Sequence, residues 1–562
     1  MHTYRWILEK GQDMCVCSDF RLTRYQGHVR IRLDEVEGVD RYLHSSRNIT
    51  CGRTISKFQL MEKIYQAIPR ACRSNMLQIK NEDIERCFRT QEVKQNGAMT
   101  EQEVTQQVGH LQHLVLVPLD RNPGATLVIC PTLYMHTFRL TFCWNAAFRS
   151  LIQSESEFLV ESKGAYDDAG LQNVAIWRTS GKLGRAYIIP KDKDYSRWRH
   201  ISPSWSEPSR TASTRLRRAL RYMLLCLPVS YHFSLRSTDH LNTALSRGVA
   251  SLKKVGGMIV ARSYDIKDMF VKLPHEEIIA SVDWLVKIHE KKNLVAVKTS
   301  VRGKNCKMAR TLHKEEGYIC LSFLTVMAML RYELGHVYTI CNGRAYQQVF
   351  GIPMGNHSSL ALADLMCTKA EYMFLMSLGS ERCLVSGVRL ANDVSVMVAA
   401  GNNGTDSQRV SRVFHRFADA YPPTLKLVRK DDCGYAWDFL GCKVFLVPDV
   451  TEVHVFPRTK NQAWLTEQGT LHYHSMQDYR SYSAKKVKRM TMTAFMLRLW
   501  RSSTDEQAAG VSIVCLIRES RLRGHPPEVF FGSLARLAKV VGGPWRSWIS
   551  QVYPHHGSTS VR

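Results

Sequence analysis

The stretch YQQVFGIPMGNHSSLA, residues 346–361, is the most informative part of the chain. Two glycines, Gly351 and Gly355, flank a proline, and small residues then begin a helix. Glycine lets a backbone approach a flat or anionic partner closely, and a helix start can bind an anion. An ordinary turn before a helix would explain the glycines and serines but not the whole string. The stretch therefore indicates a binding segment.

Acidic residues occur on both sides of this segment. Upstream, a strand that ends in acidic residues is predicted at 258–269. Its apolar start leads into Asp265, which belongs to YDIKDMF at 264–270. Downstream, VRLANDVSV at 388–396 predicts two strands joined by a turn at Asn392-Asp393, although Asn-Asp is also an ordinary turn dipeptide. Carboxylates on adjacent strands can hold divalent cations, which is what metal-dependent nucleotidyl transfer needs.

The remaining pattern predicts a mixture of helices and strands. A strand pair is expected on either side of Asp120–Gly124, and a second pair at 185–201 around a charged run. Helical periodicity is found in six segments, at residues 58–68, 76–88, 214–227, 275–288, 321–334 and 358–376, and a separate basic stretch lies at 485–489.

The composition favours a polyanion as partner. The 562 residues include 77 Lys and Arg against 50 Asp and Glu, a formal charge of +27. Such a field attracts nucleic acid first and an anionic membrane surface second. We find no secretory signal and no apolar run long enough to span a bilayer. The cysteines include only a lone CxC, Cys15 and Cys17, too little to specify a zinc site, so reduced thiols in a nuclear or cytoplasmic compartment are expected.

The three central segments, in this order, resemble the palm motifs of reverse transcriptases. Phe439-Leu440-Gly441 resembles the family's primer grip, and residues 189–199 resemble its fingers hairpin. Upstream, VPLDRNPG at 117–124 resembles the DKG-type element of Penelope-like retroelements. Downstream, LHYHS at 471–475 and the basic residues after it resemble that group's thumb. The resemblance covers about residues 110–545.

This resemblance implies an α+β fold, a right-hand polymerase with fingers, palm and thumb. The expected divisions are a mostly helical N-terminal extension at 1–110, a DKG-like element at 111–180, fingers and palm at 181–450, a basic thumb at 451–550 and a disordered tail at 551–562.

The resemblance also assigns roles to single residues. Asp265 would be the principal ligand of Mg²⁺, or of Mn²⁺ in its place, together with Asp393 and the Ile266 carbonyl. The nucleotide would be held by Lys191 or Lys193, Arg199, Phe270 as a steric gate, Gln348 and Gly355. The primer grip would be Phe439, Leu440 and Gly441, and the nucleic-acid backbone would be bound by Lys485, Lys486, Lys488 and Arg489. Lys426 and Lys430 are candidates for protonating pyrophosphate, although a solvated lysine is the simpler interpretation of each.

One position departs from the family pattern. Asn392 stands where the family has its second essential aspartate, and Leu390 replaces an aromatic residue. An amide offers one neutral oxygen where a carboxylate offers two charged ones, so metal affinity should fall. Either Asp265 and Asp393 suffice, with Asp268 nearby, or the chain is an inactive copy; we favour impaired or absent catalysis.

The expected function is RNA-directed DNA synthesis by a retroelement protein. Its partners would be an RNA template, a DNA primer and deoxynucleoside triphosphates, with no membrane. The alternatives are a non-catalytic protein that binds RNA or primer–template duplex, and a maturase-like splicing helper. We find no GIY-YIG endonuclease motif, so target DNA ends would come from elsewhere.

Overall fold

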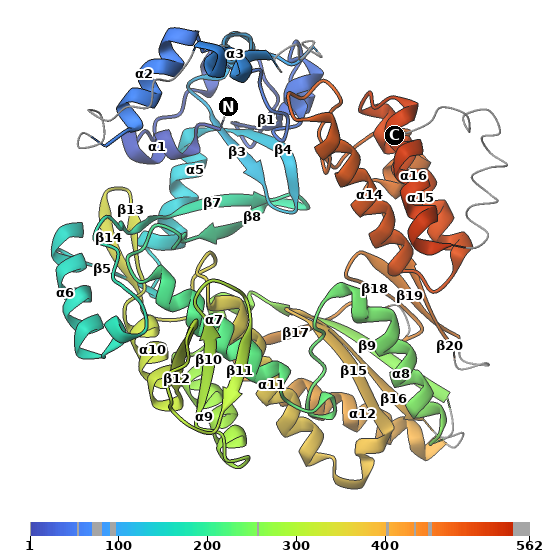
Figure 1. Cartoon of the computed structure of the whole chain (residues 1–562). Helices are drawn as coiled ribbons and strands as arrows, with labels where there is room; N and C mark the ends of the chain where they lie inside the picture. Colours follow the sequence, from blue (N-terminus) through green and yellow to red (C-terminus); the bar gives the residue numbers. More distant parts are fainter. Residues whose placement is uncertain are drawn as a thin grey trace.

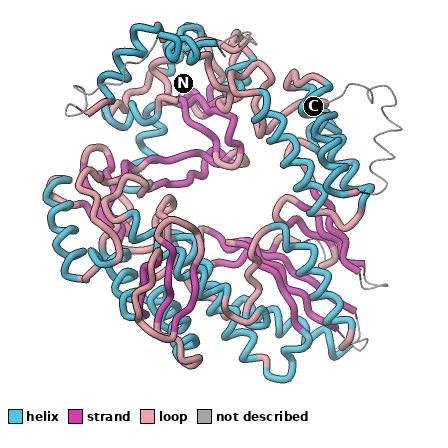
Figure 2. The backbone as a smooth tube through the Cα atoms, in the orientation of Figure 1, coloured by secondary structure: helices cyan, strands magenta, loops and turns pink. Residues whose placement is uncertain are grey.

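The backbone closes on itself as a ring, in which the N-terminal part lies beside the C-terminal helices (Figures 1 and 2). This computed structural model describes residues 2–52, 55–69, 81–89, 97–255, 258–400, 404–431, 434–447 and 452–542. Hydrogen bonds close the ring, for example from Asn48 Nδ2 to Asp478 Oδ2 at 2.8 Å and from the Tyr482 amide to the Ile49 carbonyl at 2.9 Å. No helix among the described residues is long and apolar enough to cross a membrane.

The N-terminal part is built on a four-stranded sheet of order β1-β2-β4-β3. Its strands are β1 (Arg24–Tyr25), β2 (His28–Arg32), β3 (Val115–Leu119) and β4 (Asn122–Ile129). The helices around it are α1 (Tyr4–Lys10), α2 (Lys57–Ala67), α3 (Asn81–Arg89), α4 (Glu101–Val108) and α5 (Pro131–Phe138). Because β2 pairs with β4, the expected division at residue 110 cuts through this sheet. The prediction of a mostly helical extension was therefore incomplete: it missed the short strand β2, whose five residues alternate too briefly to stand out.

The next part contains the hairpin β7 (Tyr187–Lys191) and β8 (Asp194–Ile201), a four-stranded sheet and a three-stranded sheet. The four-stranded sheet is β5 (Phe148–Ser150), β14 (Arg344–Gln348), β13 (Tyr338–Cys341) and β6 (Gly184–Arg185). The three-stranded sheet is β11 (Cys306–Ala309), β10 (Ala296–Ser300) and β12 (Tyr318–Ser322). Four helices pack with them, α6 (Glu155–Asp168), α7 (Arg210–Leu225), α9 (His275–Glu290) and α10 (Phe323–Gly335).

A four-stranded sheet of order β15-β16-β9-β17 carries the acidic segments, and we call it the carboxylate sheet. Its strands are β9 (Met258–Lys267), β15 (Val385–Leu390), β16 (Asp393–Ala400) and β17 (Lys426–Arg429), and its helices are α8 (Leu241–Lys253), α11 (Ser359–Ser377) and α12 (Gly404–Asp419). Residues of β16 alternate between two cores. Val394 and Val396 pack with α11 and α12, whereas Met397 packs with α8. Both faces of the sheet are thus covered, which accounts for its apolar strands.

The C-terminal part follows a three-stranded sheet of β18 (Ala436–Phe439), β19 (Cys442–Val447) and β20 (Glu452–Pro457). After α13 (Gln462–Glu467) come three packed helices, α14 (Lys485–Arg501), α15 (Glu506–Leu522) and α16 (Pro527–Val541). The strand pairs and helices expected from the sequence are confirmed, within a few residues at their ends. The first residues of the helix expected at 76–88 and the tail at 551–562 lie outside the described residues.

Candidate active site

The carboxylate sheet places Asp265 and Asp393 side by side. They are direct partners in the antiparallel register of β9 and β16, and Val428 of β17 lies opposite Asp265 on the other side. Residues that face each other across an antiparallel pair project from the same face of the sheet. The two carboxylates are therefore neighbours, as the sequence predicted from a strand end and a facing turn.

Asn392 contacts the same carboxylate. Its Nδ2 donates a hydrogen bond of 2.6 Å to Asp265 Oδ1, and its carbonyl accepts one of 2.8 Å from the Ile266 amide. The turn before it has Ala391 at φ 54°, a left-handed conformation that is unusual for alanine. The hairpin tip is thus held against β9 by both the backbone and the side chain of Asn392.

Lys430 supplies a positive charge at this point. Its Nζ lies 3.4 Å from Asp265 Oδ1 and 3.8 Å from Asp393 Oδ1. Burial raises the pKa of Asp393 above its usual range, and the charges of Lys430 and Arg121 act in the opposite direction. The sequence had left Lys430 between a functional and a solvated role, and it had not singled out the Arg121 side chain.

The residues present fit a divalent cation only in part. Asp265 and Asp393 offer the oxygen ligands that Mg²⁺ and Mn²⁺ prefer. Asn392, however, presents its amide hydrogens to Asp265, and Lys430 already neutralises part of the negative charge. Two carboxylates are enough to hold one cation but few for a pair of cations. No described contact brings Asp268 to these carboxylates, because its Oδ1 lies 3.9 Å from Lys191 Nζ and 3.8 Å from Arg197 Nη2.

A buried ion network fixes the strand that leads into the hairpin. The Arg389 guanidinium is fully buried, ion-paired through Nε with Glu371 and through Nη1 with Asp364 at 2.6 Å. Both acids belong to α11, and Tyr421 donates a further bond of 3.2 Å to Glu371. A buried guanidinium requires such partners, so Arg389 anchors β15 to α11.

The basic residues of the β7–β8 hairpin fall into two groups. Lys191 and Arg197 approach Asp268, as described above, and Lys193 is exposed at the tip. Arg199 instead lies 3.2 Å from Asp120 Oδ1, between β3 and β4, so its charge is already paired within the protein. The role of Arg199 in binding the triphosphate stays a prediction, and Arg197, two residues earlier on β8, is a nearby cation that the sequence had not singled out.

The segment at 346–361 packs between β8 and the turn after β9. The Ile352 amide donates to the Phe270 carbonyl at 2.8 Å, and a side chain at Gly351 would collide with that backbone. At Gly355 an added Cβ would lie 2.7 Å from the Ser202 carbonyl. Gln348 is buried and donates from Nε2 to the Phe350 carbonyl at 3.1 Å. These glycines are thus required for close packing of the chain on itself.

The residues expected as a primer grip form the turn between β18 and β19. Leu440 and Gly441 have φ of 54° and 81°, which suits a tight two-residue hairpin, and Phe439 is buried beneath it. A Cβ on Gly441 would lie 3.7 Å from Arg498 Nη2 of α14. The turn therefore lies next to the C-terminal helices.

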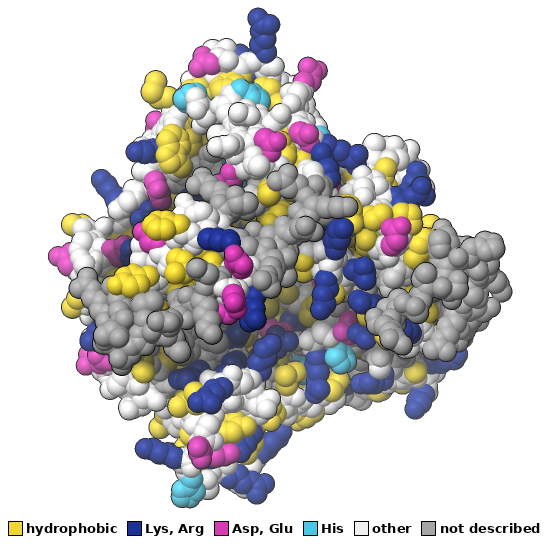
Figure 3. Space-filling model, turned by 45° about the horizontal axis from the view of Figure 1, so that its top comes forward, with side chains coloured by type: hydrophobic (Ala, Val, Ile, Leu, Met, Phe, Trp, Pro, Cys, Tyr) yellow, Lys and Arg dark blue, Asp and Glu magenta, His cyan; other side chains and the backbone are white. Residues whose placement is uncertain are grey.

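The basic residues that begin α14 differ in exposure. Lys485, Lys486 and Arg489 are exposed, but Lys488 is 4% exposed and donates from Nζ to the carbonyls of Tyr479 at 2.7 Å and Ser481 at 2.5 Å. Burial lowers the pKa of Lys488 to about 8. The prediction that Lys488 binds nucleic acid is corrected, because its ammonium is engaged internally. Figure 3 shows Lys and Arg side chains around a hollow on one face of the molecule.

Two of the sequence motifs, some 350 residues apart, are in direct contact. Asn122 is fully buried and donates from Nδ2 to Asp192 Oδ1 at 2.9 Å and to the His472 carbonyl at 3.0 Å. Its Oδ1 accepts from the His474 amide at 3.0 Å, and Gly124 lies against the His474 backbone. The N-terminal sheet, the β7–β8 hairpin and the segment before α14 therefore meet at Asn122.

Comparison with known proteins supports the fold. No protein-family model and no curated protein matches the chain. Among solved structures, telomerase from Candida albicans with a TWJ fragment of telomeric RNA matches with a TM-score of 0.51 at 12% identity, covering 91% of this chain and 76% of that one. Apo telomerase from Candida tropicalis matches with a TM-score of 0.48 at 10% identity, covering 91% and 75%. An RNA-dependent RNA polymerase of BmCPV matches with a TM-score of 0.32 at 9% identity, covering 65% and 30%.

The first of these similarities shows a reverse-transcriptase-like fold, that of a nucleic-acid polymerase, in a chain of mixed helices and sheets. At 12% identity it carries the fold alone, and it does not extend to the Penelope-like group.

Proposed function

We propose that this chain is an RNA-directed DNA polymerase of a retroelement whose catalysis is impaired by Asn392. The observation that carries the proposal is the direct pairing of Asp265 and Asp393 on adjacent strands of the carboxylate sheet. The polymerase fold and the order of the seven motifs support it. Membership of the Penelope-like group rests on the motifs at 117–124 and 471–475.

In this proposal the carboxylate sheet is the palm, the β7–β8 hairpin belongs to the fingers and α14–α16 form the thumb. An RNA template and a DNA primer would occupy the hollow seen in Figure 3. The exposed Lys485, Lys486 and Arg489 at the start of α14 would contact the phosphate backbone without reading sequence. Lys191 and Arg197 are the nearest cations for the triphosphate of an incoming deoxynucleotide, once they exchange Asp268 for phosphate oxygens.

Asp265 and Asp393 would hold Mg²⁺ or Mn²⁺, and the cation would activate the primer 3′-hydroxyl and neutralise the triphosphate. Before a cation binds, Lys430 balances the two carboxylates. Asn392 keeps Asp265 in place but contributes no negative charge. Phe270, in the turn after β9, would discriminate against a 2′-hydroxyl through its bulk. The expected product is DNA, made slowly.

The second candidate is a catalytically inactive protein that binds RNA or primer–template duplex. The contacts of Asp265 favour it, because an amide and an ammonium already satisfy this carboxylate without metal. This candidate shares the hollow and the exposed lysines of α14 with the first one and differs only at the carboxylate sheet.

Primer extension on poly(rA)/oligo(dT) with Mg²⁺ or Mn²⁺ separates the two candidates. We expect the native chain to extend slowly and Asn392→Asp to extend faster, whereas Asp265→Asn should remove extension in both backgrounds. Duplex binding is measured alongside by fluorescence anisotropy. If Asn392→Asp binds duplex normally but still makes no DNA, the polymerase proposal fails and the binding protein remains.

A further inference from the structure

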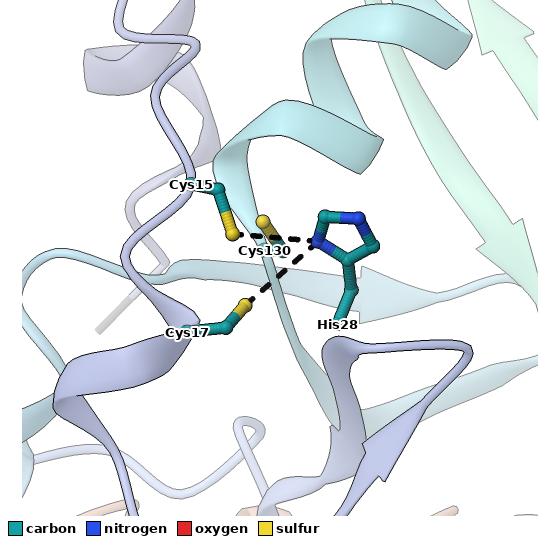
Figure 4. Close-up of side chains that lie close together, drawn as sticks. All are labelled: Cys15, Cys17, His28 and Cys130. Atoms are coloured by element: carbon teal, nitrogen blue, oxygen red, sulfur yellow. Dashed lines mark hydrogen bonds between the residues drawn. The ribbon is translucent and has the colours of Figure 1, made fainter.

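Four metal-binding side chains converge at the N-terminal sheet, far from the carboxylate sheet in the chain. They are Cys15, Cys17, His28 and Cys130, which we call the Cys₃His cluster (Figure 4). Their Sγ and imidazole nitrogen atoms all lie within 4.8 Å of one another. The CxC pair alone was too little to predict a zinc site, and its partners, at the start of β2 and directly after β4, meet it only in the folded chain.

The spacing of these atoms resembles the ligand shell of a tetrahedral ion. Around Zn²⁺, tetrahedral bonds of about 2.3 Å to sulfur and about 2.0 Å to nitrogen place sulfur and nitrogen ligands about 3.5 Å apart. Cys15 Sγ lies 3.5 Å from His28 Nδ1, and Cys17 Sγ lies 4.0 Å from the same nitrogen. Figure 4 shows the three thiols and the imidazole pointing toward one another. The side chains need little movement to reach a common ion.

The surroundings suit negatively charged thiolates. The Val29 amide donates a hydrogen bond of 3.2 Å to Cys17 Sγ, the kind of outer contact that orients a ligand. Arg24 Nη2 donates to the Cys17 carbonyl at 2.7 Å, which brings a positive charge beside the cluster. Three thiolates and a neutral imidazole around Zn²⁺ carry a net charge of −1, and the guanidinium offsets it.

Packing alone does not explain the cluster. Cys17 and Cys130 belong to a hydrophobic core, where buried thiols are ordinary. Cys15 is exposed, however, and His28 is half-buried, so the burial of apolar surface gives no reason for either to turn toward the two core thiols.

We propose that the Cys₃His cluster binds one structural Zn²⁺ ion. Soft thiolates with an imidazole favour zinc, and four protein ligands leave no open position for catalysis. The ion would join the loop after α1, the start of β2 and the start of α5, and it would add to the contacts that Asp13 of this loop already makes with Thr132 and Arg139. It would stabilise the N-terminal part, which in turn contacts the segment before α14.

The test is to purify the full chain under reducing conditions and to measure its metal content by inductively coupled plasma mass spectrometry. We expect one zinc per chain. Cys15→Ser is the main variant, because Cys15 is exposed and its replacement leaves the core intact. Competition with a chelator should show its zinc affinity reduced by more than about 100-fold, since even outer contacts of zinc ligands are worth 10–100-fold. Cobalt in place of zinc should give the thiolate charge-transfer bands of a tetrahedral site.

Two further variants, which should both retain zinc, serve as controls. Cys51→Ser removes a thiol of the same N-terminal part that lies outside the cluster, and it should retain the zinc. His28→Cys changes the ligand but not the coordination and should retain zinc with an altered cobalt spectrum. The proposal is overturned if the folded native chain takes up no zinc, if Cys15→Ser binds zinc as tightly as the native chain, or if the metal found is iron.

Discussion

Asn392 Nδ2 donates a 2.6 Å hydrogen bond to Asp265 Oδ1, at the point where strands β9 and β16 of the carboxylate sheet bring Asp265 and Asp393 together. Lys430 Nζ lies 3.4 Å from the same oxygen. An aspartate at 392 could not donate this bond, and it would add a like charge beside two carboxylates. The asparagine therefore stabilises the two carboxylates without metal, and under the proposed function its missing charge would weaken their affinity for a cation.

Asn392→Asp should bind Mn²⁺ more tightly than the native chain. A third carboxylate adds one negative charge to the ligands and removes the amide bond that holds Asp265. We expect the dissociation constant, measured by titration calorimetry, to fall by at least tenfold. Asn342→Asp, which adds the same charge at an exposed turn, is the matched control and should change little. An unchanged affinity in Asn392→Asp would show that the hairpin tip is not a metal ligand.

Much of the site could be predicted from local patterns. The strand ending near Asp265, the turn at Asn392-Asp393 and the tight turn at Gly441 each have a short-range signal, and each was found. What the sequence could not reveal depends on long-range packing. The guanidinium of Arg199 is paired with Asp120, about eighty residues earlier in the chain. The ammonium of Lys488 is bound by two backbone carbonyls that precede the helix. His28 and Cys130 similarly meet the CxC pair only in the folded chain.

Glu371→Gln should destabilise the chain strongly. Glu371 is fully buried and neutralises the buried Arg389 guanidinium, so the variant leaves a charge without its main partner. Breaking a buried pair in this way costs about 3–5 kcal/mol. Urea unfolding followed by circular dichroism measures the change in the free energy of unfolding.

The matched control for this pair is Glu381→Gln. Glu381 pairs with Arg416 at 3.3 Å, but both side chains are partly exposed. Such pairs contribute less than about 1 kcal/mol. Equal losses in the two variants would contradict the anchoring role of Arg389.

Gly124→Ala should loosen the junction between the N-terminal sheet and the segment before α14. An added Cβ would lie 2.2 Å from the His474 carbonyl oxygen, so the two segments must separate. We expect a lower melting temperature and faster proteolysis at this junction. Gly109→Ala is the control, because Gly109 has helical φ and nothing within 4 Å of an added Cβ. Equal melting temperatures for Gly124→Ala and the native chain would contradict the close contact.

Lys486→Ala should weaken duplex binding, whereas Lys488→Met should lower the stability of the fold. Lys486 is exposed on α14, so its loss should weaken duplex binding and reduce the salt slope by about 1, with the melting temperature unchanged. Lys488→Met keeps the aliphatic stem but leaves two carbonyls without a donor, which costs about 1–3 kcal/mol. Anisotropy over a range of salt concentrations and thermal unfolding measure the two effects. A large loss of binding in Lys488→Met without a loss of stability would restore Lys488 as a nucleic-acid ligand.

The contact between Asp34 and His474 should make ring closure sensitive to acid. Burial alone would raise the pKa of Asp34, but hydrogen bonds from His474 and Arg32 outweigh it and hold that pKa well below its usual range. Burial lowers the pKa of His474, against the attraction of Asp34, and Arg523 lowers it further. Both groups have a folded pKa below the unfolded one, so each contributes stability that is present at neutral pH and is lost as the pH falls.

The loss should begin below the usual histidine pKa of about 6.5, where His474 binds a proton in the unfolded chain more readily than in the folded one. It should continue below about 3.9, where the same becomes true of Asp34. Asp34→Asn removes the second part, so its melting temperature should be lower at pH 7 and should fall less steeply below pH 4. The exposed Asp239→Asn serves as control and should follow the native curve. Because Asp34 belongs to the N-terminal part and His474 to the C-terminal part, proteolysis at the junction should rise in parallel with the native loss. An Asp34→Asn curve parallel to the native one at every pH would show that this contact does not couple protonation to ring closure.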